Sequence, residues 1–241
     1  MLIEPHTLFS KFGVKPRGIL HVGAHKGDMF SKYNKVWPSE DMKIIWVEAI
    51  PELAEFLVDF LPSHKNKVIN AVVWDKNDLI MNFNISSNLQ SSSLLSFESH
   101  SQNYPDIKMI KTIQIKTKRL DSLIKHDDNI DLLVLDIQGA ELMALKGLGM
   151  ELVRVNWIVC EVNRFNVYKD NPLVENIDNY LSNFGFKRII TRWTSAGWGD
   201  ALYVGPDLRR GYKTNIVAFR IKEFILPYRI RGKIRQIYNK F

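Results

Sequence analysis

The chain has 241 residues, of which 46% are hydrophobic and 24% charged, values that suit one soluble α/β domain with a decorated end. Its single cysteine excludes an intramolecular disulfide, and because neither a secretion signal nor an 18-residue apolar stretch is present, we expect a cytoplasmic protein. The formal net charge of +7 falls on residues 211–241, which hold eight Lys or Arg and one acid, so we expect a neutral domain over 1–210 and a basic extension over 211–241.

The first strand–loop–helix–strand unit is typical of a nucleotide-binding site. An apolar strand is predicted at 18–22, a helix around 27–37 and a second strand at 43–48. Gly23 and Gly27 allow the loop to turn tightly, and Glu48 ends the second strand, where an acid accepts ribose hydroxyls. His25 stands where a dinucleotide site needs a glycine close to the pyrophosphate. The loop therefore favours S-adenosylmethionine (SAM) over NAD, although two glycines can also merely end a strand and begin a helix.

The rest of the chain alternates between apolar strands and helices. Further strands are predicted at 68–73, 131–136, 155–162, 186–193 and 201–204, and further helices after Pro51 and at 140–148 and 173–184. This alternation favours a doubly wound, mostly parallel sheet of seven strands. The last strand follows its predecessor through a short loop, 194–199, which indicates an antiparallel edge pair. Residues 79–118 interrupt the alternation and are expected to form a hairpin extension at the ligand side.

The carboxyl ends of the predicted parallel strands carry a consistent set of residues: Gly23, Glu48, Asn70, Asp136 and Glu161. Ligands of open α/β sheets bind outside these ends. Charge at a buried strand end is costly, which favours a functional role for Asp136 and Glu161 over a structural one as hydrogen-bond acceptors. Glu141 opens the next helix and is interpreted as a stabilising charge at a helix N-terminus.

Four segments resemble the FkbM-type SAM-dependent methyltransferases: His-Val-Gly-Ala-His-Lys-Gly at 21–27, Trp-Val-Glu-Ala at 46–49, Leu-Asp-Ile-Gln-Gly-Ala-Glu at 135–141 and Gly-Trp-Gly-Asp-Ala-Leu-Tyr at 197–203. The resemblance, which runs from about 17 to 205, implies a class I methyltransferase sheet with strand order 3-2-1-4-5-7-6. It also implies O-methylation, often of sugars or natural-product hydroxyls. His21 departs from the wider class, in which an acid commonly precedes the glycine loop.

The resemblance and the strand-end pattern together give the residues that we expect to hold SAM. They are His21, Gly23, Ala24, Gly27, Glu48, Ala49, Asn70, Ala71, Asp136 and Gln138.

The chemistry needs little from the protein, because the sulfonium of SAM is already an activated methyl donor. The enzyme must align an acceptor oxygen and remove its proton, and His25, Asp136 and Glu161 are the candidate bases. Some sugar O-methyltransferases use a divalent cation instead; here Asp136, Glu161 and Asn163 would form an oxygen-rich set that suits Mg²⁺. The remaining histidines are interpreted as surface or structural residues: His6, His64, His100 and His126.

The acceptor is expected to be a hydroxyl of a carbohydrate or a glycolipid-like molecule. Four residues near the last strand ends are candidates for its pocket, although aromatic side chains in such loops more often serve packing. They are Asn163, Tyr168, Trp193 and Trp198. The alternative is a non-catalytic SAM- or nucleotide-binding accessory protein that docks on membrane or RNA through its basic extension.

The basic extension contains two different segments. Residues 216–226 are more apolar, and packing on the domain or on a second copy of the chain is their default interpretation. Residues 228–241 have the pattern of a basic amphipathic helix. This pattern favours an anionic surface, here the inner face of a membrane. Nucleic acid is disfavoured as a partner because the neutral domain offers no basic groove that would extend the basic surface of residues 228–241.

Overall fold

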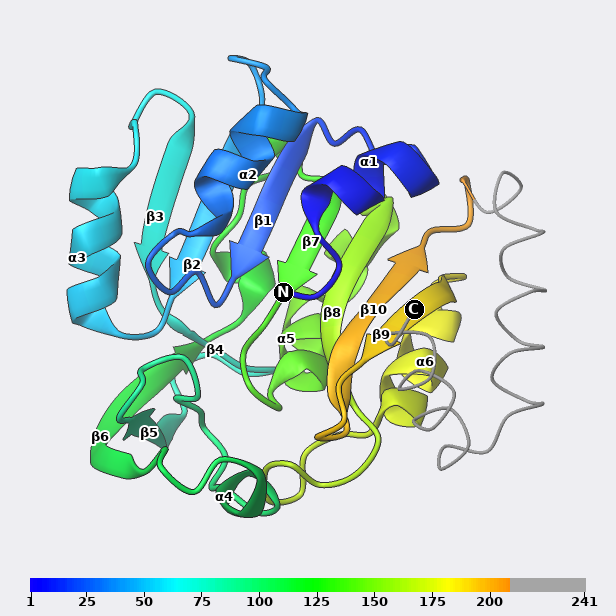
Figure 1. Cartoon of the computed structure of the whole chain (residues 1–241). Helices are drawn as coiled ribbons and strands as arrows, with labels where there is room; N and C mark the ends of the chain where they lie inside the picture. Colours follow the sequence, from blue (N-terminus) through cyan, green and yellow to red (C-terminus); the bar gives the residue numbers. More distant parts are fainter. Residues whose placement is uncertain (209–241) are drawn as a thin grey trace, which may run out of the picture.

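A seven-stranded sheet forms the centre of the computed structural model, which describes residues 1–208 (Figure 1). Its strand order is β3-β2-β1-β7-β8-β10-β9. The first five of these strands are parallel, and β10 is antiparallel to both β8 and β9. The bounds are β1 (Gly18–Val22), β2 (Lys43–Glu48), β3 (Asn66–Asn70), β7 (Leu132–Leu135), β8 (Trp157–Asn163), β9 (Lys187–Trp193) and β10 (Trp198–Val204). The predicted doubly wound sheet, its implied strand order and its antiparallel edge are confirmed.

Helices cover both faces of this sheet (Figure 1). On one face lie α1 (Pro5–Phe12), α2 (Met29–Val36) and α3 (Pro51–Phe60), and on the other lie α5 (Glu141–Leu148) and α6 (Val174–Ser182). Because successive side chains of a strand point to opposite faces, Ile19 enters the core beneath α1–α3 and Leu20 the core beneath α5 and α6. Proline in the first turn begins both α1 and α3, as its fixed φ allows. Helix α1 was not predicted.

The insert between β3 and β7 forms a second, smaller sheet with the order β4-β6-β5. Its antiparallel strands β5 (Ile80–Ser86) and β6 (Met109–Lys118) confirm the expected hairpin. The prediction of one strand over 68–73 was wrong in one respect, because this segment belongs to two strands. The chain leaves the large sheet after Asn70, and β4 (Val72–Val73) pairs with β6 instead. In Figure 1 the arrowheads of β1, β2, β3 and β7 point towards this small sheet.

Short helical segments complete the described part of the chain. They are α4 (His100–Asn103), η1 (Leu120–Ser122), η2 (His126–Asp128) and η3 (Gly149–Arg154). The final strand begins at Trp198 and not at residue 201, because Gly199 lets β10 approach β9 closely: a Cβ there would lie 2.2 Å from the Arg192 carbonyl oxygen. Within residues 1–208, no helix is long and apolar enough to cross a membrane. The predictions for 211–241 lie outside the described residues.

Candidate active site

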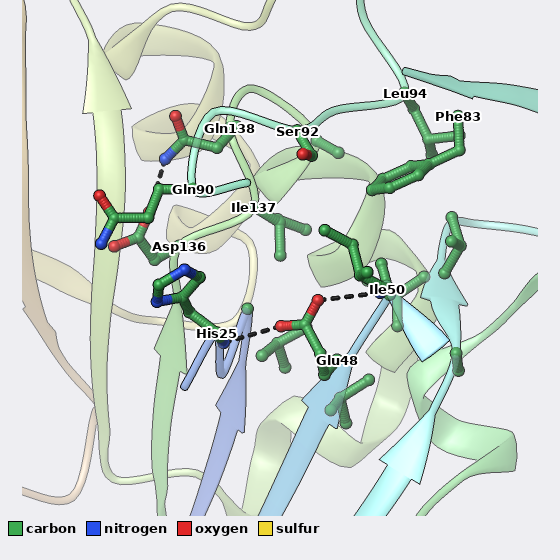
Figure 2. Close-up of a pocket in the computed structure, with 18 of the residues that line it drawn as sticks. His25, Glu48, Ile50, Phe83, Gln90, Ser92, Leu94, Asp136, Ile137 and Gln138 are labelled. Atoms are coloured by element: carbon green, nitrogen blue, oxygen red, sulfur yellow. Dashed lines mark hydrogen bonds between the residues drawn. The ribbon is translucent and has the colours of Figure 1, made fainter. Parts of the chain in front are cut away.

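Two adjoining pockets open at the carboxyl ends of the parallel strands. The first, here called the strand-end pocket, lies between β1, β2 and β7 on one side and the insert on the other (Figure 2). Its insert wall is largely apolar and includes Phe83, Leu89 and Leu94, which belong to or pack against a small hydrophobic cluster around Ile50. The insert therefore lies over the carboxyl ends of the parallel strands, the side at which a ligand is expected.

Glu48 forms the polar floor of the strand-end pocket. Its Oε2 accepts a hydrogen bond from the backbone N–H of His25 at 2.7 Å, and its Oε1 accepts one from the backbone N–H of Ile50 at 2.9 Å. Burial raises the pKa of the Glu48 carboxyl, and the two backbone donors oppose that shift. Each carboxylate oxygen has a second lone pair, so Glu48 can still accept hydrogen bonds from a ligand.

The loop after β1 is held against the end of β7 by a glycine. Gly23 has φ +87°, and a Cβ at this position would lie 1.9 Å from the carbonyl oxygen of Asp136. Only glycine therefore fits there. His25 has φ +49°, lines both pockets, and has a ring whose pKa is lowered mainly by burial. Gly27 lies outside both pocket linings and instead makes room for Leu57.

His21 is a buried, neutral side chain beneath the loop. Its Nδ1 lies 2.9 Å from the Tyr33 hydroxyl, its ring stacks on Trp46 with the centroids 5.0 Å apart, and burial lowers its pKa to about 4. Together with Ala24 it contributes to the second pocket. A buried imidazole supported by aromatic rings thus takes the place of the acid that commonly precedes the glycine loop.

Three of the residues expected to hold SAM lie near the ends of β2 and β3: residues 49 and 71 line the strand-end pocket, but Asn70 does not. Ala49 and Ala71 contribute to the wall beside Glu48. The Asn70 side-chain amide donates to the backbone carbonyls of Glu48 and Ala49, at 2.9 and 3.2 Å. Asn70 therefore supports the end of β2 from outside the pocket.

Asp136 and Glu161 are brought together by Gln138. The Gln138 Nε2 lies 2.7 Å from Asp136 Oδ1 and 3.0 Å from Glu161 Oε2; Figure 2 shows the first of these bonds. Burial raises the pKa of Glu161 well above its usual range, and the nearby Asp136 carboxyl adds to that shift. Glu161 therefore holds its proton more strongly than an exposed glutamate does.

Glu141 has the structural role that the sequence indicated. Its carboxylate accepts the backbone N–H groups of Ile137 at 3.0 Å and of Gly139 at 3.0–3.1 Å. It thereby fixes the turn that carries Gln138. Burial raises the pKa of Glu141 to about 7.

The second pocket, here called the outer pocket, joins the carboxyl pair to the aromatic residues of the insert and of β10. Two of the candidates for an acceptor pocket, Tyr168 and Trp198, line it together with Tyr104, whose hydroxyl accepts the Trp198 indole N–H at 3.0 Å. Asn163 and Trp193 are not among the residues that line it. The Arg164 guanidinium instead stacks over Trp193, with the guanidinium carbon 4.1 Å from the centroid of the Trp193 ring.

His100 also lines the outer pocket, and the sequence analysis missed it. Of the two interpretations, surface or structural, the structure excludes the surface one, because the ring is buried, stacks on Phe97 at 3.9 Å between centroids and lies 3.2 Å from the Ser91 hydroxyl. No strand end or helix periodicity in the sequence marks this position. His6, His64 and His126 are exposed, as expected.

The metal site considered for Asp136, Glu161 and Asn163 is not supported. Across residues 1–208, no group of three or more His, Cys, Asp or Glu is arranged to hold an ion. The Gln138 amide N–H groups fill the place between the two carboxyls, where a cation would need acceptor oxygens. Asn163 pairs with Trp198 in the sheet and lies outside the linings of both pockets.

The strand order, the antiparallel β10 and the pockets at the strand ends define a Rossmann-like, class I methyltransferase fold. The chain belongs to the FkbM methyltransferase family, because the model of the methyltransferase FkbM domain matches residues 21–188. The resemblance seen in the motifs is thereby confirmed. No curated protein matches the chain.

Several solved structures are similar to this chain at low sequence identity. An FkbM methyltransferase from Methylobacillus flagellatus has a TM-score of 0.54 and 14% identity over 83% of this chain, which spans 48% of that protein. A SAM-dependent methyltransferase from Aquifex aeolicus has a TM-score of 0.42 and 13% identity, with 83% and 88% of the two chains covered. Magnesium protoporphyrin IX methyltransferase from Synechocystis, solved with bound SAM, has a TM-score of 0.46 and 8% identity, with 83% and 76% covered.

Proposed function

We propose that this chain is a SAM-dependent O-methyltransferase whose acceptor is a hydroxyl of a carbohydrate or a glycolipid-like molecule. The observation that carries the proposal is the placement of Glu48 and the Asp136–Glu161 pair on two pockets that share Gly23, His25 and Gln138. One site can thus hold a nucleoside, and the adjoining site can hold an acceptor beside groups that accept a proton.

The strand-end pocket fits the adenosine part of SAM. Glu48 keeps one free lone pair on each oxygen and can accept both ribose hydroxyls. Phe83, Leu89 and Leu94 offer an apolar wall against which an adenine ring can pack. Gly23 and Ala24 bring the loop backbone to the boundary with the outer pocket, where the amino-acid end of SAM would be held.

The outer pocket fits a hydroxyl-bearing acceptor. Tyr104, Tyr168 and Trp198 provide aromatic surface of the kind that stacks on sugar rings. SAM supplies an activated methyl group, so the chain must orient the acceptor oxygen and take up its proton. We assign that proton to Asp136, which lines both pockets and has the readily protonated Glu161 as its neighbour. His25 is the competing base, because its lowered pKa leaves it neutral near pH 7.

Calorimetry with SAM, followed by incubation of the full chain with methyl-labelled SAM and a surface-glycan extract, tests the proposal. We expect SAM to bind, NAD to fail to bind, and label to enter an alkali-resistant glycan fraction. In the Asp136→Asn variant, label transfer should fall at least a hundredfold while SAM still binds. SAM binding without transfer to any acceptor would favour the non-catalytic accessory protein, and absence of SAM binding would refute the proposed methyltransferase.

A further inference from the structure

The Gln138 side chain is placed so that each of its polar atoms has a defined partner. Its Nε2 reaches Asp136 Oδ1 at 2.7 Å and Glu161 Oε2 at 3.0 Å, so each amide hydrogen can serve one carboxyl. Its Oε1 accepts the hydroxyl of Tyr168 at 2.6 Å. The carboxyl pair thus receives two N–H donors from one side chain, and that side chain is itself held by a third residue.

The backbone of Gln138 is fixed as tightly as its side chain. Its φ is +58°, in the left-handed region that a non-glycine residue rarely adopts. The Ser93 hydroxyl donates to the Gln138 carbonyl at 2.7 Å, and Glu141 accepts the N–H groups of the two neighbouring residues. A strained turn that is held from both sides aims the side chain at the pair, and such strain is typical of functional positions.

By donating to Oε1, the Tyr168 hydroxyl holds the amide in the orientation in which its N–H groups face the carboxyls. A carboxamide can rotate by half a turn with little change of shape, which would present its oxygen to the pair in place of its N–H groups. An oxygen in that place would disfavour ionised carboxyls, whereas the N–H groups favour them. Tyr168 is itself immobilised, since it is 1% exposed and its backbone N–H donates to Asn171 Oδ1 at 2.9 Å.

We propose that Gln138 is a positioning residue that holds Asp136 and Glu161 as one hydrogen-bonded pair, and that the Tyr168 hydroxyl fixes the Gln138 amide with its N–H groups towards that pair. The inference rests on the proposed function and deepens it, because it names the residues that keep the proton acceptor ready for use. Neither residue needs to touch the reacting atoms.

Other titratable groups also face the pair, and the test must separate their effects. Glu141 of α5 and Asp200 of β10 both favour a protonated Glu161, while His21 and His25 on the β1 side interact with Asp136. None of these four accepts a hydrogen bond from Tyr168, whose hydroxyl donates to Gln138. Removing that hydroxyl alone therefore leaves the surrounding charges in place.

The test compares two buried tyrosines by calorimetry, with SAM and S-adenosylhomocysteine as probes between pH 5 and 9. The positive sulfonium of SAM favours an ionised pair, so the affinity for SAM relative to S-adenosylhomocysteine should rise with pH in the wild type. In Tyr168→Phe we expect the midpoint of that rise to move up by about one pH unit. Tyr203→Phe is the matched control, because it removes a hydroxyl that is equally buried but donates to Asp178 at 2.8 Å.

Gln138→Glu is a second variant, which keeps the length of the side chain and can adopt the same backbone conformation. It replaces the N–H donors by a third carboxyl, and we expect an upward shift at least as large as that of Tyr168→Phe. A wild-type affinity ratio that is independent of pH, equal midpoints in the two tyrosine variants, or an unshifted Gln138→Glu would each overturn the inference while SAM binding itself stands. Failure of the wild type to bind SAM would instead refute the proposed function, and this inference with it.

Discussion

The backbone N–H of His25 donates to the Glu48 carboxylate at 2.7 Å, although the two residues lie 23 positions apart. This bond ties the loop after β1 to the end of β2, so the glycine loop and the acid form one unit. Because Ile50 donates to the other oxygen of the same carboxylate, Glu48 cannot swing away from the pocket. The carboxylate is thereby oriented before any ligand arrives, which lowers the cost of binding.

Replacing this carboxylate should weaken SAM binding. Hydrogen bonds to charged groups contribute about 1.5–3 kcal/mol each, so we expect Glu48→Ala to raise the dissociation constant for SAM at least tenfold in calorimetry. Glu52→Ala is the control, because it removes an exposed carboxylate in the first turn of the neighbouring helix α3. Undiminished affinity in Glu48→Ala would show that the ribose does not bind there.

A comparison of two glycines can distinguish the cost of backbone strain from the cost of a steric clash. Gly13 and Gly23 both have positive φ, but a Cβ at Gly13 would meet nothing within 4 Å, whereas one at Gly23 would overlap the Asp136 carbonyl. We expect Gly13→Ala to lower the free energy of unfolding by about 1–2 kcal/mol. Gly23→Ala should cost distinctly more and should abolish SAM binding, as measured by urea unfolding and calorimetry. Equal losses of stability would mean that the loop moves aside freely.

Asp200 should make stability depend on pH. Burial, with a contribution from Asp136, raises its pKa to about 6, while Ile3 donates its N–H to the same side chain at 2.9 Å. The folded state therefore holds this proton more strongly than the unfolded state does. The resulting stabilisation is full below about pH 4 and is lost as the pH rises through about 6.

The variant Asp200→Asn cannot ionise at this position and should not show that loss. The free energy of unfolding of both proteins can be measured with urea at pH 4, 5, 6 and 7. Between pH 4 and pH 7, the variant should gain up to about 3 kcal/mol in stability relative to the wild type. A stability difference that is constant with pH would contradict the prediction.

Chelation should leave cofactor binding unchanged. The Gln138 N–H groups stand between Asp136 and Glu161, so a cation is not needed to keep this pair together. We expect SAM affinity and melting temperature to be the same with EDTA and with millimolar Mg²⁺. A rise in melting temperature with Mg²⁺ that disappears in Asp136→Asn would reinstate the metal site.

The basic extension, outside the described residues, carries a prediction from sequence alone. Its residues 228–241 combine five Lys or Arg with apolar residues at helical spacing. Each basic residue near an acidic leaflet contributes about 1 kcal/mol. Full-length protein should sediment with anionic vesicles at low salt, and a chain ending at Leu226 should not. Equal sedimentation of the two would remove the anchor and leave the proposed reaction untouched.

The sequence alone determined the fold and which strand-end residues form the candidate site. Apolar strands alternating with helices are a local pattern, and parallel strands bring their carboxyl ends to one edge of the sheet. Glu48, Asp136 and Glu161 could therefore be placed together without knowledge of any contact. The motif at 135–141 likewise led to the family that the match over residues 21–188 confirms.

Only the tertiary structure decided how those residues are held and which partners the insert brings. The bonds of Gln138 to Glu161 and to Tyr168 join residues 23 and 30 positions apart, and His100 reaches the outer pocket from an irregular segment. Likewise, Asn70 turned away from the pocket because its amide satisfies the backbone carbonyls at the end of β2. Such contacts depend on the path of a long loop, and a loop has no periodicity from which its contacts can be inferred.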